Sequence, residues 1–111
     1  MKELLSKIYD KLDEKQAEDI VLLDVRGITP IADYFVIASA DNERKVKSMA
    51  NELDDFIEKN GLSLKSKEGM DTSRWILLDY GDIIVHLFHE EERDFYNIEK
   101  IWKDGINITP N

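Results

Sequence analysis

The chain has 111 residues and no cysteine, and it carries 24 acidic against 15 basic side chains, which gives a formal net charge of −9. This length predicts a single domain over residues 1–111, and the lack of cysteine excludes disulfides and thiolate zinc sites. The negative charge disfavours direct nucleic-acid binding, because acidic groups repel phosphates within a Debye length of about 8 Å, so a basic protein surface is the more natural partner.

No segment of the sequence resembles a membrane anchor or a secretory leader. The apolar runs fall well short of the roughly 18 residues that a membrane span needs. Residues 1–7 already carry charges and lack a long apolar core, so they do not form a signal peptide. We therefore expect a cytoplasmic protein without membrane contact.

The first third of the chain predicts one helix followed by two strands. Residues 2–16 repeat leucine and isoleucine at helical spacing, with lysine and glutamate on the other face. Residues 20–25 and 34–39 are nearly continuous apolar runs, which are typical of strands covered on both faces. Pro30 lacks a backbone donor and marks a loop between these strands.

A second helix and a third strand are predicted next. Asp41 or Asn42 can cap a helix that runs to residue 59, with an apolar stripe along one side and a glycine stop at Gly61. Residues 62–67 then alternate apolar and polar side chains. That alternation predicts a strand with one solvated face.

Residues 74–88 predict a β-hairpin, and a final helix follows it. Branched and aromatic residues fill both arms, and Tyr80-Gly81 sits between two aspartates where the chain reverses. A helix is expected from about Glu90, because three glutamates favour its positive amino-terminal end. Residues 105–111 are expected to be frayed. The expected buried stripe of the last helix comprises Phe95, Ile98, Ile101 and Trp102.

These elements predict an α/β fold with a single mixed five-stranded sheet packed by helices. A helix crossover joins parallel strands, whereas the hairpin arms pair antiparallel. Within the hairpin, alternation directs Trp75 and Leu77 to one face and Ile76 and Leu78 to the other. Helices on one side of such a sheet leave part of the other side uncovered.

The hairpin mixes aromatic and acidic residues, and two interpretations of it stay open. In the first, an exposed aromatic patch rimmed by Asp79 and Asp82 binds a protein partner, since such mixtures are typical of interfaces. The aromatic members of that patch are Trp75, Tyr80, His86 and Phe88. In the second, the aromatic residues belong to the core and the aspartates only form the turn.

The sequence contains no recognisable catalytic or metal-binding pattern. His86 and His89 lie three apart in a predicted strand and point to opposite faces, which argues against a shared metal. Aspartates at positions 24, 33, 79 and 82 suit magnesium by type, but no phosphate-binding glycine loop accompanies them. We expect no enzyme activity, no cofactor and no metal, and a small nucleotidyltransferase-like enzyme stays as an alternative.

Several separated motifs occur in order along the chain. They are Ala17-Glu18-Asp19-Ile20, Leu23-Asp24-Val25, Asp33-Tyr34-Phe35-Val36-Ile37, residues 74–88, residues 93–99 and Ile101-Trp102-Lys103-Asp104. With these motifs, residues 17–104 resemble the ribosomal silencing factor family, also called the Iojap family. The resemblance implies a fold similar to that of nucleotidyltransferases. It also implies a factor that binds the large ribosomal subunit and blocks its joining with the small subunit.

The resemblance further implies a partner and a set of contact residues. Family members dock onto the basic large-subunit ribosomal protein number fourteen, where the small subunit must approach, and the resemblance favours a homodimer. The implied partner-binding residues are Trp75, Asp79, Tyr80, Asp82, His86, Phe88, Arg93 and Tyr96. Residues 38–43 depart from the turn of glycine, threonine and serine that is common in relatives, which leaves the contacts there open. A generic dimeric adaptor is the third alternative.

Overall fold

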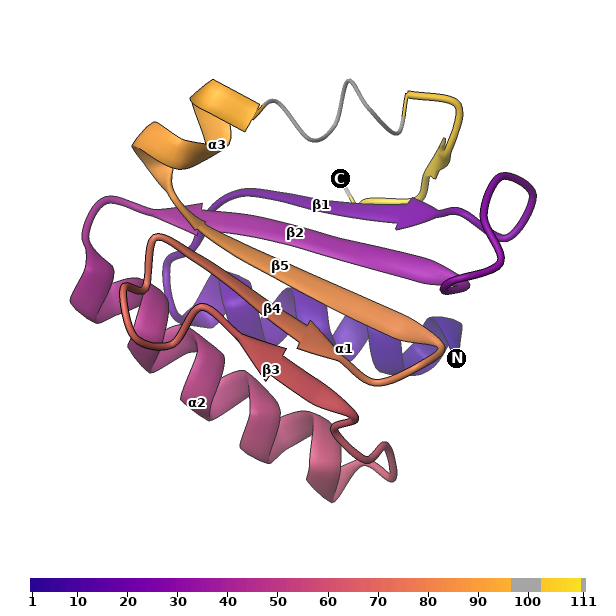
Figure 1. Cartoon of the computed structure of the whole chain (residues 1–111). Coiled ribbons are helices and arrows are strands. Elements are labelled where there is room, and N and C mark those ends of the chain that lie inside the picture. Colours follow the sequence, from indigo (N-terminus) through magenta and orange to yellow (C-terminus); the bar gives the residue numbers. More distant parts are fainter. Residues whose placement is uncertain (97–102, 111) are drawn as a thin grey trace.

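The computed structural model describes residues 1–96 and 103–110, and the side chains of residues 94–96 fall outside that description. Figure 1 shows one sheet with two long helices on one side and a shorter helix on the other. The elements in chain order are α1 (Lys2–Glu14), β1 (Glu18–Asp24), β2 (Tyr34–Ala40), α2 (Glu43–Lys59), β3 (Ser66–Glu68), β4 (Trp75–Asp79), β5 (Ile83–His89), α3 (Glu90–Tyr96) and β6 (Ile106–Asn107).

The sheet is mixed and, over the described part of the chain, its strands follow the order β3-β4-β5-β2-β1-β6. Strands β2 and β5 run parallel at its centre, and every other neighbouring pair is antiparallel. Both central strands are buried along their whole length, as their apolar sequences require. The predicted α/β class, with a single mixed sheet packed by helices, is confirmed.

The predicted number of five strands is wrong, because the described residues form six. The additional strand, β6, comes from the segment that was expected to be frayed, and it pairs antiparallel with the end of β1. Thr109 holds this segment in place, since its Oγ1 accepts a hydrogen bond from Leu22 N at 2.9 Å. A strand of two residues has no periodicity that a sequence pattern can detect.

Strand β3 is shorter than predicted and begins later. Of the expected range 62–67, only the last two residues join the ladder, which continues to Glu68. The alternation arises because Leu62 and Leu64 pack against the core from an extended loop. Lys65 N then donates to Asp79 O at 2.7 Å and brings the chain alongside β4.

Helix α2 begins and ends where its sequence signals predict. Asn42 Oδ1 accepts a hydrogen bond from Lys45 N at 2.8 Å, so Asn42 and not Asp41 caps the helix. Gly61 follows the helix with φ of +101°, a left-handed conformation that glycine adopts without a Cβ clash.

Helices α1 and α2 cover one face of the sheet (Figure 1). The apolar stripe of α1 buries Leu5, Ile8 and Leu12, and that of α2 buries Val46, Met49, Ala50, Leu53 and Ile57. These side chains pack on strand residues that include Val36, Ile76 and Val85. This layer holds most of the buried apolar residues, and apolar burial stabilises a fold by about 25 cal/mol per Å². Within the described residues, no helix has both the length and the apolar character needed to cross a membrane.

The opposite face of the sheet carries a thinner apolar layer. Its buried members are Leu23, Val25, Ala32, Phe35, Ile37, Ile84 and Phe88. Helix α3 contacts β2 and β5 at one end of this face. Val21 of β1 and, on β4, Trp75 and Leu77 are only partly buried against the layer, so β4 carries an accessible part of this face. The predicted stripe of the last helix involves side chains outside the described residues.

Candidate functional site

The hairpin of β4 and β5 presents two different faces, as its alternation predicts. Ile76 and Leu78 are fully buried on the helix side, whereas Trp75 and Leu77 are half-buried on the opposite side. In the register of the hairpin, Trp75 lies across from Phe88. The two faces therefore have separate roles, and only the face of Trp75 is available to a partner.

Three aromatic rings and one imidazole pack together behind the accessible part of Trp75. The Trp75 and Phe88 rings stack with their centroids 4.9 Å apart, and His86 packs edge-on against Phe35 at 5.1 Å. Trp75 Nε1 also donates a hydrogen bond to His86 Nδ1 at 3.3 Å. These contacts hold the indole in one orientation, so that its accessible part is a fixed feature of the surface.

His86 is a neutral, buried member of this cluster. Burial lowers the pKa of its imidazole to about 4, because the charged form would lose its hydration. Since Nδ1 accepts from the indole, the proton of the neutral ring lies on Nε2, and that atom has no hydrogen-bond partner among the described residues. The side chain is therefore poorly suited to carry a positive charge near neutral pH.

The predicted exposed aromatic patch is wrong for Tyr80. This residue is 3% exposed and packs on the helix side, because the alternation that buries Ile76 and Leu78 there continues to Tyr80. Its hydroxyl donates to Asp54 Oδ1 of α2 at 2.7 Å. Burial, together with this carboxylate, raises the pKa of Tyr80. Tyr80 therefore joins the hairpin to α2.

The exposure predicted for His86 and Phe88 is also wrong, although both lie on the predicted face. His86 is 6% exposed and Phe88 is fully buried. Both belong to the central strand β5, which is flanked by β4 and β2. Their rings instead support Trp75, which is the one aromatic member of the predicted patch with substantial exposure.

The two predicted aspartates lie at the tip of the hairpin. Asp79 is half-buried, and its Oδ1 accepts a hydrogen bond from Gly81 N at 2.8 Å, so this carboxylate also forms the turn. Gly81 takes φ of +90°, which suits glycine. Asp82 is exposed. Asp79 shares the face of Trp75 and Leu77 at the other end of β4, whereas Asp82 lies in the turn.

Arg93 and Tyr96 come from helix α3. Arg93 is buried, and its guanidinium donates to Ser39 Oγ at 3.2 Å and to Glu18 O at 3.4 Å. The structure thus places this charge inside the chain, where it fixes α3 against the ends of β1 and β2. Tyr96 closes α3, and its side chain lies outside the described residues.

Two further residues share the accessible face, and neither was predicted as part of the site. Leu77 follows Trp75 by two positions, and Glu68 pairs with Leu77 in the ladder between β3 and β4, so all three point the same way. We call the set Glu68, Trp75, Leu77 and Asp79 the hairpin surface. The spacing of Leu77 was visible in the sequence, whereas the position of Glu68 depends on a register that no sequence pattern specifies.

The loop between β3 and β4 is held by contacts at both of its ends. Ser73 N donates to Gly69 O at 2.9 Å. Arg74 then forms ion pairs with Glu43 at 2.9 Å, with Glu91 at 3.1 Å and with Glu92 at 2.9 Å. These glutamates belong to α2 and α3, so Arg74 ties the start of β4 to both helices. The backbone that carries Trp75 is consequently well fixed.

Gly69→Ala is expected to destabilise the fold and to disturb the position of Trp75. Gly69 has φ of +87°, and a Cβ there would lie 2.0 Å from the Trp75 carbonyl oxygen. The left-handed conformation alone costs an ordinary residue roughly 1–2 kcal/mol, and the clash adds to it. Urea unfolding measures the loss. Gly27→Ala is the matched control, because no atom lies within 4 Å of its Cβ. Equal stabilities for the two variants would contradict the close approach.

The described residues include no group of three or more histidine, cysteine, aspartate or glutamate side chains placed to share a metal ion. They therefore do not support metal coordination. His89 and His86 lie at odd spacing on β5 and point to opposite faces. His89 Nδ1 instead accepts a hydrogen bond from Glu91 N at 3.2 Å, at the start of α3. Asp24, another residue considered for magnesium, pairs with Arg26 at 2.7 Å.

Comparison with known proteins supplies the family. The model of the family described as "Ribosomal silencing factor during starvation" matches residues 1–111. The chain is 46% identical over 93 residues to the ribosomal silencing factor RsfS of Bacillus subtilis, covering 84% of this chain and 79% of that protein. It is 42% identical over 106 residues to RsfS of Halalkalibacterium halodurans, covering 96% and 91%.

A solved structure agrees with these sequence relatives. The crystal structure of a protein from Bacillus halodurans is similar to this chain with a TM-score of 0.85 and 36% identity, and the match covers 99% of this chain and 100% of that one. The similarity therefore extends over the sheet and its helices as well as over the motifs. With a family model that spans the whole chain, the protein belongs to the ribosomal silencing factor family.

Proposed function

We propose that the protein represses translation by binding the large ribosomal subunit, through its ribosomal protein number fourteen, and by blocking the approach of the small subunit. The observation that carries this proposal is the hairpin surface. Trp75 and Leu77 provide half-buried apolar contacts, and the carboxylates of Glu68 and Asp79 lie beside them. A basic ribosomal protein complements such a surface in both polarity and charge.

The rigidity of the hairpin surface supports a binding role. Trp75 is held by Phe88 and His86, and the preceding loop is tied to two helices through Arg74. A surface that is already ordered loses little conformational entropy on association, so more of the contact energy appears as affinity. The central tryptophan is also the residue type most enriched among interface hot spots.

Steric occlusion requires no chemistry from the chain. The factor and the small subunit compete for the same large subunit, so the effect depends on the free concentration of each and on their dissociation constants. The relatives are named for silencing and not for a reaction, which fits this mechanism. No observation on the described side chains favours the alternative of a nucleotidyltransferase-like enzyme. The homodimer and the cytoplasmic location stay predictions.

Sedimentation tests the binding step. Purified large subunits, small subunits and the protein are mixed in pairs and run on sucrose gradients at near-physiological salt. We expect the protein to migrate with the large subunit and to stay at the top of the gradient with the small one. Migration with small subunits only, or with neither, would contradict the proposed function.

A further inference from the structure

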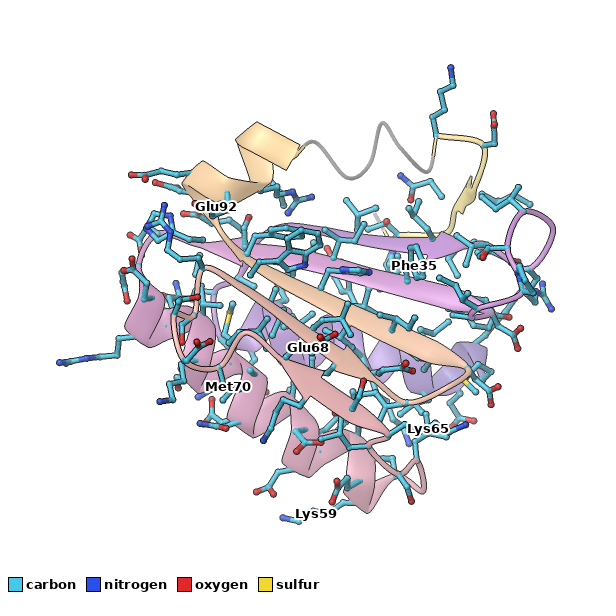
Figure 2. The ribbon with its side chains drawn as sticks, viewed as in Figure 1. Phe35, Lys59, Lys65, Glu68, Met70 and Glu92 are labelled. Atoms are coloured by element: carbon cyan, nitrogen blue, oxygen red, sulfur yellow. The ribbon has the colours of Figure 1, made fainter. Side chains whose placement is uncertain are left out.

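A small pocket opens on the hairpin surface. Glu68, Trp75 and Leu77 line it, and its volume is about 250 Å³. Figure 2 shows Glu68 on the same side of the sheet as Phe35, in front of β3 and β4. Pockets for cofactors and drug-sized ligands usually span roughly 300–1,000 Å³, so this one suits a single side chain better.

The walls of the pocket combine apolar surface with one carboxylate. Trp75 and Leu77 supply the apolar part, and both are half-buried. Glu68 is exposed, and its carboxylate has no ion pair or hydrogen bond with any described residue. The neighbouring Lys67 pairs with Leu78, so alternation directs its ammonium to the helix side, away from Glu68. The pocket therefore has a negative charge that no lysine of its own strand neutralises.

A basic side chain matches these walls better than other groups do. Lysine and arginine have apolar stems that pack on apolar surface while their charged heads stay near solvent. Tryptophan attracts such heads more strongly than other aromatic rings, and a carboxylate accepts charge-assisted hydrogen bonds from them. A phosphate would be repelled by Glu68 and by the net charge of −9.

From this geometry we infer that the pocket receives a lysine or arginine side chain of the docked partner, and that Glu68 selects for its positive charge. The inference rests on the proposed function, because it names a contact within the proposed ribosomal complex. It adds a specificity-determining residue at a position outside the motifs that carry the family resemblance. Glu68 acts through charge, whereas Trp75 and Leu77 provide the shape of the pocket.

The local backbone prepares Glu68 for this role. Glu68 is the last residue of β3 and pairs with Leu77, while Gly69 follows at φ of +87° and approaches the Trp75 carbonyl closely. The backbone positions of Glu68 and Trp75 are thereby fixed on adjacent strands before any partner arrives. Such preorganisation favours selective recognition of one charged group.

Glu68→Gln tests the inference with little change in shape. Affinity for purified large subunits is measured by sedimentation over a range of salt concentrations, for the wild type, for Glu68→Gln and for the control Glu14→Gln. Glu14 is exposed at the end of α1 and carries the same charge, but it lies on the helix side of the sheet. We expect Glu68→Gln to bind about tenfold more weakly at low salt, with a flatter salt dependence, while Glu14→Gln binds like the wild type.

The outcomes separate this inference from the proposed function. If the wild type itself does not bind large subunits, both fail. If the wild type binds and Glu68→Gln has the same affinity for large subunits as Glu14→Gln, the pocket inference fails while the proposed function stands. Glu68→Lys reverses the charge and should weaken binding more than Glu68→Gln does. Its matched control is Glu14→Lys, which should weaken binding less than Glu68→Lys. Thermal melts of all variants should stay close to the wild type, since Glu68 has an exposed side chain.

Discussion

Trp75→Ala is expected to weaken binding to large ribosomal subunits by about thirtyfold or more. Truncation of a hot-spot tryptophan removes roughly 2 kcal/mol or more of binding free energy, and each 1.4 kcal/mol is about tenfold in affinity. Trp75 provides the largest apolar contact of the hairpin surface and one wall of its pocket. Co-sedimentation with large subunits measures the loss.

Trp75→Ala also removes internal packing, because the indole stacks on Phe88 and donates to His86. The side chain is only half-buried, so the loss of stability should be smaller than the roughly 3–5 kcal/mol typical of fully buried tryptophans. Phe56→Ala is the matched control. It truncates another half-buried aromatic residue, on helix α2 and on the far side of the sheet.

Thermal melts and binding, measured side by side, decide between an interface role and a purely structural one. Both variants should remain folded, and only Trp75→Ala should lose affinity for the large subunit. Intact binding by folded Trp75→Ala would show that the hairpin surface is not the site of contact. A fully unfolded Trp75→Ala would assign Trp75 to the core instead.

The second large effect concerns pH, and we expect His86 to make the fold less stable in acid. Burial lowers the native pKa of His86 to about 4, against an ordinary value near 6.5. Between these values the unfolded chain binds a proton that the folded chain does not, so acid favours unfolding. The contribution of the neutral ring to the free energy of unfolding is fully present above about pH 6.5. This contribution declines as the pH falls towards 4, by up to about 3 kcal/mol.

Urea unfolding at several pH values between 4.5 and 7.5 measures this effect, with His86→Gln and His89→Gln compared against the wild type. Glutamine at position 86 cannot titrate, so the free energy of unfolding of that variant should depend less on pH. The variant at position 89 keeps His86 and should retain the steeper dependence. Equal slopes for the wild type and His86→Gln would mean that the imidazole is not held neutral.

Local patterns in the sequence specify most of this fold. The apolar run at 34–39 identifies a central strand, the leucine spacing in residues 2–16 identifies α1, and a cap at Asp41 or Asn42 predicts the start of α2. Pairings that depend on single distant contacts are not specified in this way. Strand β6 pairs with the end of β1, and Thr109 bonds to Leu22, 87 positions away.

The candidate site was predicted less well than the fold, and the reason is physical. Alternation places Trp75 correctly, but the same alternation puts Tyr80 on the helix side, contrary to the predicted exposed patch. The burial of His86 depends on the Phe35 ring, which arrives through the parallel pairing of β2 with β5. Glu68 reaches the surface beside Trp75 only through the β3–β4 register. Tertiary pairing, which local periodicity does not encode, decides the burial of His86 and the position of Glu68.

Subunit joining is the measurement that tests the central claim most directly. Large subunits are incubated with increasing amounts of the protein, small subunits are added, and light scattering follows the formation of joined ribosomes. We predict that the joined fraction falls as the protein rises, that excess small subunits restore it, and that Trp75→Ala needs a far higher concentration for the same effect. Unimpaired joining on large subunits that sedimentation shows to be saturated with the protein would contradict silencing by occlusion.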